Sequence, residues 1–200
     1  MSNPLQKAID EFWNKTLFKI IPKFVTPNYF TFLRFFLIPV VLCFMAIQWF
    51  GMALLIFLLA ALADSIDGSL ARIRKQISEY GTMLDPMADK FLIVLSSLFL
   101  FFYYPYVSLL LIVIIIDVLI GMEGLVLMIM KRDLETPPSN WTGKSKMVFQ
   151  VASILIIMFY LMTSSVVLLD ISVIILYLSI FTGVLSFFSY GWRAYKILKM

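Results

Sequence analysis

The chain has 200 residues, of which 62% are hydrophobic and only 14% charged, far from the usage of soluble proteins. Its 16 basic and 12 acidic residues give a net charge of +4, and it contains no histidine and one cysteine. This composition predicts an all-α integral membrane protein, excludes a disulfide within the chain and any histidine-based metal site, and leaves oxygen-bound hard cations as candidate metals.

The first segment, residues 1–23, carries apolar residues at helical spacing, with its charged side chains mostly elsewhere around the helix. A helix of this kind lies in the membrane interface. Pro22 and Pro27 interrupt it before the first long hydrophobic run. We therefore predict an N-terminal amphipathic, interfacial helix at residues 1–23.

Six hydrophobic runs follow, each close to the roughly 20 residues that cross a bilayer as a helix. They predict transmembrane helices at residues 29–50, 52–74, 83–104, 106–130, 145–166 and 171–192. No repeat or linker divides them. The prediction is one domain, residues 1–200, with a six-helix transmembrane bundle over residues 29–192.

Basic residues gather at one side of this predicted bundle. They lie before the first span, after the second, between the fourth and fifth, and after the sixth, whereas the connections at 49–51, 103–106 and 163–170 contain no lysine or arginine. Because basic loops stay in the cytoplasm, we predict a multi-pass protein of the cytoplasmic (inner) membrane with both termini cytoplasmic. The same distribution accounts for the positive charge without a nucleic-acid partner.

Four aspartates, here called the signature aspartates, interrupt the second and third predicted spans: Asp64, Asp67, Asp85 and Asp89. An ionised aspartate at the centre of a membrane helix costs about 2.5–3.5 kcal/mol, so such residues face a cavity or a partner. Each pair shares a helix face, and two antiparallel helices can converge both pairs on one point. Four carboxylates must then be protonated or bridged by cations, and oxygen ligands favour Mg²⁺ or Mn²⁺.

The residues around the signature aspartates suit a bound phosphate. Gly68 and Gly81 allow close approach of either a ligand or a facing helix, and both interpretations stay open. Arg72 stands near the end of its predicted helix, where a guanidinium can bind phosphate bidentately. Carboxylates, divalent cations and an arginine together predict phosphoryl transfer, in which two metals contact the attacking and leaving oxygens.

These residues resemble the signature of the CDP-alcohol phosphotransferases, and the juxtamembrane helix and six predicted spans extend the resemblance over most of the chain. The signature reads Asp64-x₂-Asp67-Gly68-x₂-Ala71-Arg72-x₈-Gly81-x₃-Asp85-x₃-Asp89. The resemblance implies an enzyme in which an acceptor hydroxyl attacks the β-phosphorus of CDP-diacylglycerol, so that a phosphodiester forms and CMP is released. A cation transporter is the alternative from another class, but it has no need of the glycine and arginine that suit a nucleotide diphosphate.

The resemblance also assigns roles to individual residues. It implies a two-metal site for Mg²⁺ or Mn²⁺ at the signature aspartates, with Asp89 as the catalytic base. It implies CDP binding by a set of small and polar residues near the same helix ends: Asp64, Gly68, Ala71, Arg72, Asn28 and Thr31.

Three segments resemble the phosphatidylglycerophosphate synthase and cardiolipin synthase branch: TPNYFTFLRFFLIP at 26–39, LDPMADK at 84–90 and GKSKMVFQ at 143–150. The expected acceptor is therefore an anionic alcohol, first of all glycerol 3-phosphate, with phosphatidylglycerol, serine and inositol phosphate as alternatives. The resemblance further implies contact with membrane lipid and a homodimer. The acceptor site is predicted to use basic residues at the cytoplasmic side: Arg34, Arg132, Lys144, Lys146 and Arg193.

The fourth predicted span departs from this branch. Its members carry an arginine-acid pair there, whereas this chain has Ile116-Asp117, with Glu123 further on. The sequence leaves open whether Asp117 and Glu123 stand in for that pair, and which basic residue replaces the arginine.

Overall fold

The computed structural model describes residues 11–16, 18, 22, 26, 28–74, 79–130 and 141–198, without the side chains of residues 79–83, 85, 86, 123–130, 190 and 193–198. Within these ranges every regular element is a helix and none is a strand. The all-α prediction is therefore confirmed for the described part of the chain.

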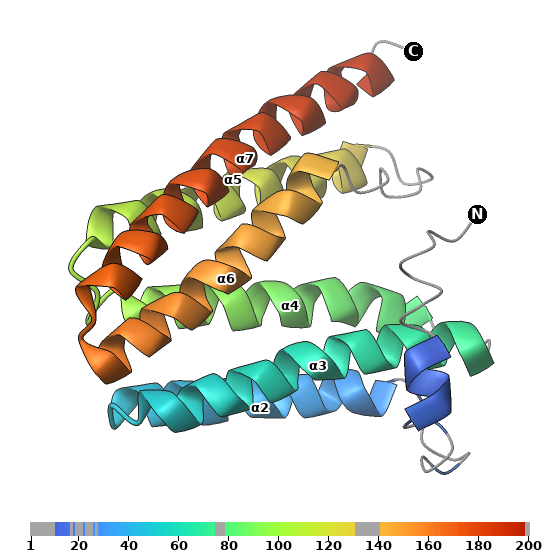
Figure 1. The fold of residues 1–200 in the computed structure, drawn as a ribbon. Helices are drawn as coiled ribbons and strands as arrows, with labels where there is room; N and C mark the ends of the chain where they lie inside the picture. The colour runs from blue at the N-terminus through green and yellow to red at the C-terminus, as the bar shows by residue number, and fades with distance from the viewer. Residues whose placement is uncertain are drawn as a thin grey trace. The chain divides into compact units, whose positions relative to one another are not determined.

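The longer helices are drawn and labelled in Figure 1. They are α2 (Asn28–Ala46), α3 (Phe50–Arg74), α4 (Glu79–Leu100), α5 (Val107–Met130), α6 (Trp141–Thr163) and α7 (Val166–Leu198). Among the described residues, four helices are long and apolar enough to cross a membrane, namely α2, α3, α6 and the Val166–Ser189 part of α7, and α5 adds a shorter apolar stretch. The chain is a membrane protein with several such helices.

The helix ends differ from the predicted spans by a few residues, and the turns explain two of these differences. Gln48 adopts a left-handed backbone conformation with φ of 59°, so α2 ends at Ala46 and α3 begins at Phe50. Ser164, with φ of 53°, makes a similar turn, and α7 begins at Val166 instead of 171. Hydropathy could not show the first turn, because the apolar residues Ile47 and Trp49 flank Gln48, whereas the second turn lies in the short polar run Thr163-Ser164-Ser165.

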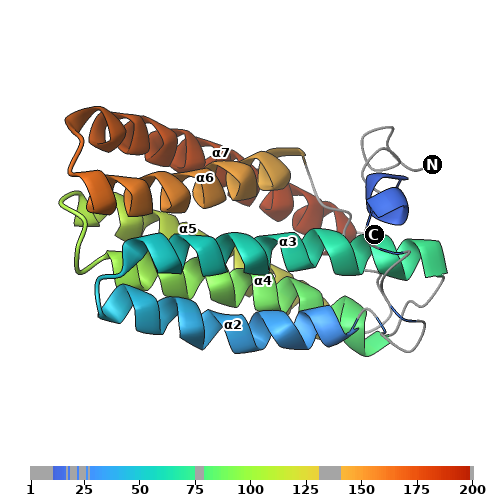
Figure 2. The ribbon, with the colours of Figure 1, turned by 60° about the horizontal axis from the view of Figure 1, so that its bottom comes forward.

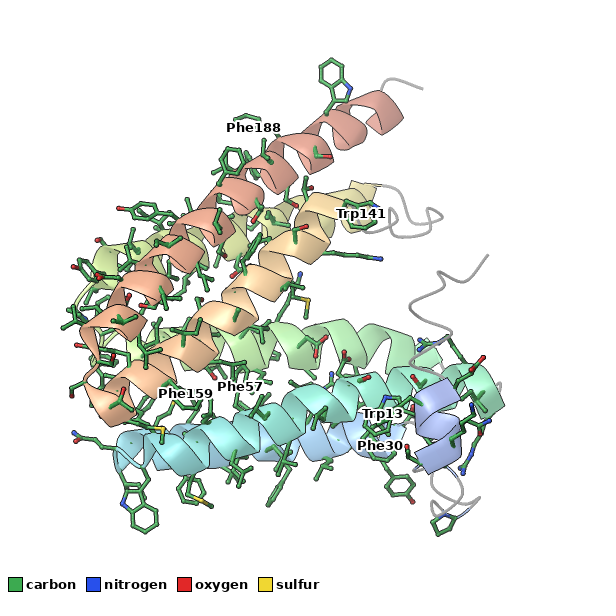
Figure 3. All side chains as sticks on the ribbon, in the orientation of Figure 1. Trp13, Phe30, Phe57, Trp141, Phe159 and Phe188 are labelled. Atoms are coloured by element: carbon green, nitrogen blue, oxygen red, sulfur yellow. The ribbon has the colours of Figure 1, made fainter. Side chains whose placement is uncertain are left out.

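The predicted interfacial helix lies mostly outside the described residues, which include a helical segment at 11–16. Trp13, labelled in Figure 3, lies against α3, where its indole Nε1 donates a hydrogen bond of 3.0 Å to the Ser65 hydroxyl. Arg74 at the end of α3 donates to the carbonyl of Pro22 at 3.2 Å. The described N-terminal residues thus contact the same half of α3 that carries two signature aspartates, while their place in a membrane interface stays a prediction.

The chain divides into two compact units, residues 1–92 and 93–200, and each is described by itself. In the first unit α2 and α3 lie side by side, as Figures 1 and 2 both show. The completely buried residues Ala53, Phe57 and Ala60 recur at helical spacing along α3. This side of α3 is therefore packed against other parts of the chain, and the contact of α2 with α3 brings Arg34 next to Asp64 and Asp67.

In the second unit α7 packs against both α5 and α6, and Figure 2 shows α6 running beside α7. The hydroxyl groups of Tyr104, in the connection before α5, and Ser172 of α7 are 2.6 Å apart and form a buried hydrogen bond. Trp141 and Phe188 point away from their helices in Figure 3 and are 83% and 68% exposed. Large apolar side chains that face outward in this way are typical of helices surrounded by lipid.

Candidate active site

Arg34 of α2 lies among three of the four signature aspartates. Its Nη2 atom is 3.1 Å from Oδ1 of Asp64 and 3.0 Å from Oδ2 of Asp67, and its Nη1 atom is 2.7 Å from Oδ1 of Asp89. The two carboxylates of α3 and the one of α4 therefore meet at a single guanidinium within the first unit.

The sequence spacing explains how each helix presents its polar groups. Asp64 and Asp67 are one turn apart on α3, so both face the same way. Thr31 and Arg34 are one turn apart on α2, and both are buried, with Arg34 at 0% exposure. A guanidinium in this position is stable only with charge-assisted hydrogen bonds to anions, which the three carboxylates supply.

Arg34, Asp64, Asp67 and Asp89 form the first cluster, which is negatively charged and accessible on one side. One guanidinium against three carboxylates leaves two negative charges, before Asp85 is considered. The side chain of Asp64 is 45% exposed and that of Asp89 is 20% exposed, whereas Asp67 is almost completely buried at 3%. An approaching cation or a phosphate with its counter-ions can therefore reach the cluster from the Asp64 side.

Gly68 and Arg72 lie next to the cluster on α3. Among the described residues, a Cβ atom added to Gly68 would have one neighbour within 4 Å, the Nη1 atom of Arg72 at 3.3 Å, which is the end of a flexible side chain. Within the described part of the chain, no other helix approaches Gly68 closely enough to require a glycine there, and this favours approach of a ligand. Arg72 is exposed and its Nη2 donates a hydrogen bond of 3.2 Å to Ser69, which orients the guanidinium along this part of the helix.

Several predicted site residues lie outside the described side chains. They are Gly81, Asp85, Glu123, Arg132 and Arg193. The metal role of Asp85 and the acceptor roles of Arg132 and Arg193 therefore stay predictions. Asn28 and Ala71 are half-buried and lie on the same helices as the cluster, on α2 and α3 respectively.

A second polar cluster occupies the second unit. Lys146 of α6 forms an ion pair with Oδ1 of Asp117 on α5, and Gln150 donates a hydrogen bond of 2.6 Å to Oδ2 of the same carboxylate. Gly183 of α7 approaches so closely that an added Cβ would be 2.9 Å from Cγ2 of Ile116 and 3.6 Å from Cδ of Lys146. Three helices thus enclose one lysine-aspartate pair.

The sequence pointed to Lys146 and Asp117 separately, but it predicted neither their pairing nor the contact of Gln150 with Asp117. The available signal was the spacing of Lys146 and Gln150, which are one helical turn apart in an apolar run. Lys144, two residues before Lys146, is exposed at the first turns of α6. The two lysines of the GKSK segment therefore differ in environment, since only Lys146 is buried.

The first cluster has the donor chemistry of a site for a hard divalent cation. Carboxylate oxygens are its only anionic groups, and such oxygens are preferred ligands of Mg²⁺ and Mn²⁺. Within the described residues no three acidic side chains form a metal site by themselves, and the Arg34 guanidinium stands against all three carboxylates. The residues present fit such ions in chemistry, and Asp85 is the predicted fourth ligand.

Apolar helices that carry a cluster of aspartates around a buried arginine define a membrane protein with a polar site built into its helices. The profile of the CDP-alcohol phosphatidyltransferase family matches residues 24–185, which include both clusters. The chain therefore belongs to this family.

Several curated relatives bear the name CDP-diacylglycerol–glycerol-3-phosphate 3-phosphatidyltransferase. The one from Cereibacter sphaeroides is 45% identical over 76 residues, 35% of this chain and 34% of the relative. The one from Blochmanniella floridana is 42% identical over 84 residues, 39% of this chain and 43% of the relative. The chain spans less than half the length of these relatives.

Proposed function

We propose that this protein is a phosphatidyltransferase that uses CDP-diacylglycerol as donor and glycerol 3-phosphate as acceptor. The observation that carries the proposal is the convergence of Asp64, Asp67 and Asp89 on one buried guanidinium, in the segment that bears the family signature. The names of the partly matching relatives support this donor and acceptor.

In the proposed reaction the acceptor hydroxyl attacks the β-phosphorus of CDP-diacylglycerol. A bond forms between that oxygen and the phosphorus, the bond to the oxygen bridging the two phosphates breaks, and CMP leaves with the electron pair. Asp89 accepts the hydroxyl proton, for which its partly exposed carboxylate is suited. Exposed Arg72 and the open backbone at Gly68 hold the diphosphate in position.

Asp64, Asp67, Asp85 and Asp89 are the residues proposed to hold a pair of Mg²⁺ or Mn²⁺ ions. Such ions, when bound, supply neutralisation of the diphosphate and of the charge that develops on the leaving oxygen. The oxygen donors of the cluster and its residual negative charge support this assignment.

The acceptor phosphate is proposed to bind basic residues near the start of α6. Lys144 is the best placed of the described candidates, because it is exposed, whereas Lys146 is buried and paired with Asp117. Arg34 is the least suited, since its guanidinium is directed at three carboxylates. Asp117 and Gln150 then serve to hold the Lys146 side chain in place and link α5 to α6 through side chains.

We propose the following arrangement in the membrane: one domain, six transmembrane helices, both termini in the cytoplasm and the inner membrane as location. The basic residues at alternate helix ends support it. A homodimer is proposed only from the family resemblance.

The test is release of CMP by the purified protein in nanodiscs containing CDP-diacylglycerol, with glycerol 3-phosphate and Mg²⁺ or Mn²⁺. Asp64→Asn, Asp67→Asn, Asp85→Asn and Asp89→Asn should each lower the rate by about 100-fold or more. Asp170→Asn, at an exposed position of α7, is the matched control and should keep the wild-type rate. Wild-type rates in all four signature variants would reject the site.

The acceptor is identified in the same assay by exchanging glycerol 3-phosphate for phosphatidylglycerol, serine or inositol phosphate. Of these four acceptors, we expect only glycerol 3-phosphate to support CMP release. Release with another of these compounds, and none with glycerol 3-phosphate, would keep the reaction type and correct the acceptor.

A further inference from the structure

We propose that Arg34 is a positioning residue that holds Asp64, Asp67 and Asp89 together in the absence of divalent cations and competes with those cations for the same carboxylates. This inference rests on the proposed function, because it concerns the cations that the proposed reaction uses. It differs from the acceptor-binding role that the sequence predicted for Arg34.

The geometry supplies the first step. Nη2 of Arg34 is shared by Asp64 and Asp67, at 3.1 and 3.0 Å, while Nη1 contacts Asp89 at 2.7 Å. Carboxylates gathered around one group repel each other unless a positive charge lies among them. Arg34 provides that charge from a different helix, so the carboxylates of α3 and α4 have a common partner before any cation binds.

Burial supplies the second step. The Arg34 side chain is 0% exposed, and its Nε atom has no hydrogen-bond partner among the described residues. Water therefore does not offset the charge of the guanidinium, and the carboxylates are the groups that compensate it. The carboxylate oxygens that stabilise the buried guanidinium are the same oxygens that a metal would bind. Pairing with Arg34 and binding of a divalent metal ion therefore oppose each other.

Two variants separate the charge of Arg34 from its shape. Arg34→Gln keeps a hydrogen-bond donor but removes the charge, and Arg34→Lys keeps the charge on a group that cannot form the same fork toward three carboxylates. Arg74→Gln is the matched control, because Arg74 lies at the end of α3 and donates to the carbonyl of Pro22, outside the cluster.

The experiment measures thermal unfolding of the purified protein without substrate, first in EDTA and then over a titration with MgCl₂ or MnCl₂. In EDTA, Arg34→Gln should unfold about 5 °C or more below the wild type, because the three carboxylates then lose the positive charge of the guanidinium. The cation concentration that gives half of the maximal rise in unfolding temperature is here called the half-point. In Arg34→Gln the half-point should fall at least about tenfold, which corresponds to about 1.4 kcal/mol in the free energy of cation binding. Arg74→Gln should leave that concentration unchanged.

If the role of Arg34 is purely structural, Arg34→Gln will lower the unfolding temperature equally in EDTA and in saturating cation and will leave the half-point unchanged. That result would reject the inference. A higher half-point in Arg34→Gln would also overturn it. So would an unchanged half-point together with a raised KM for glycerol 3-phosphate, which is the signature of acceptor binding. If Arg34→Gln does not fold, Arg34→Lys decides the question, with a smaller fall in the half-point expected.

The inference and the proposed function fail in different ways. If cations stabilise the wild type and Arg34→Gln lowers the half-point, but no acceptor supports CMP release, the inference stands and the proposed function falls. If neither Mg²⁺ nor Mn²⁺ changes the unfolding temperature of the wild type, the inference is wrong, whatever the assay of CMP release gives.

Discussion

Replacing Asp117 by asparagine should destabilise the second unit strongly, because it leaves the Lys146 ammonium without its counter-charge. The side chains of Lys146 and Asp117 are 8% and 21% exposed. Removing one partner of a buried ion pair costs about 3–5 kcal/mol. Since Asp117 keeps some exposure, we expect about 3 kcal/mol. For a chain of this size, that corresponds to a fall in Tm of roughly 6–12 °C.

The measurement is thermal unfolding of purified protein followed by tryptophan fluorescence. Asp170→Asn makes the same chemical change at an exposed position of α7 and should shift the free energy of unfolding by less than about 0.5 kcal/mol. Lys146→Met should be destabilising for the complementary reason, since Asp117 then keeps only Gln150 as a described partner. Lys144→Met, at the exposed lysine nearby, is its control.

The double variant Asp117→Asn/Lys146→Met tests whether the two residues act as a pair. Because both charges are then absent, we expect it to be more stable than the sum of the two single losses, by about 1–3 kcal/mol. Strict additivity of the single losses, or a Tm of Asp117→Asn within about 2 °C of the wild type, would refute the argument that the Lys146–Asp117 ion pair stabilises the second unit.

Three further changes are informative. Gly183→Ala would place a methyl group 2.9 Å from Ile116 and should cost about 1–3 kcal/mol in thermal unfolding. Gly121→Ala, which would meet no described residue within 4 Å, should be neutral or stabilising, and equal effects would contradict the close packing of α7. Gly68→Ala should leave Tm unchanged or raise it but lower CMP release about tenfold or more, and an unchanged rate would show that no ligand needs this space. Tyr104→Phe removes a buried hydrogen bond of 2.6 Å and should cost about 1 kcal/mol, measured against the wild-type Tm.

The helices themselves could be predicted because a segment in lipid must satisfy its backbone hydrogen bonds internally, and long apolar runs mark such segments. Their ends could be predicted only approximately. Gln48 and Ser164 reverse the chain through left-handed backbone conformations, and neither residue type signals such a turn on its own.

The candidate site was predictable in part for the same kind of local reason. The spacing of Asp64 and Asp67 puts both carboxylates on one face of α3, and the cost of unpaired carboxylates in lipid demands a positive partner. From the sequence, the predicted partner is a metal ion. The structure adds a guanidinium from α2, at hydrogen-bonding distance from three of the four signature aspartates.

The sequence by itself determined the class of fold, the membrane environment, the position of the signature aspartates and the family. Each of these depends on composition or on spacing within one helix. Tertiary structure alone decided which cation meets which anion: Arg34 with Asp64, Asp67 and Asp89 in the first unit, and Lys146 with Asp117 in the second. The physical reason is that helical periodicity determines the face on which a charge lies, whereas its partner depends on which helix packs against that face.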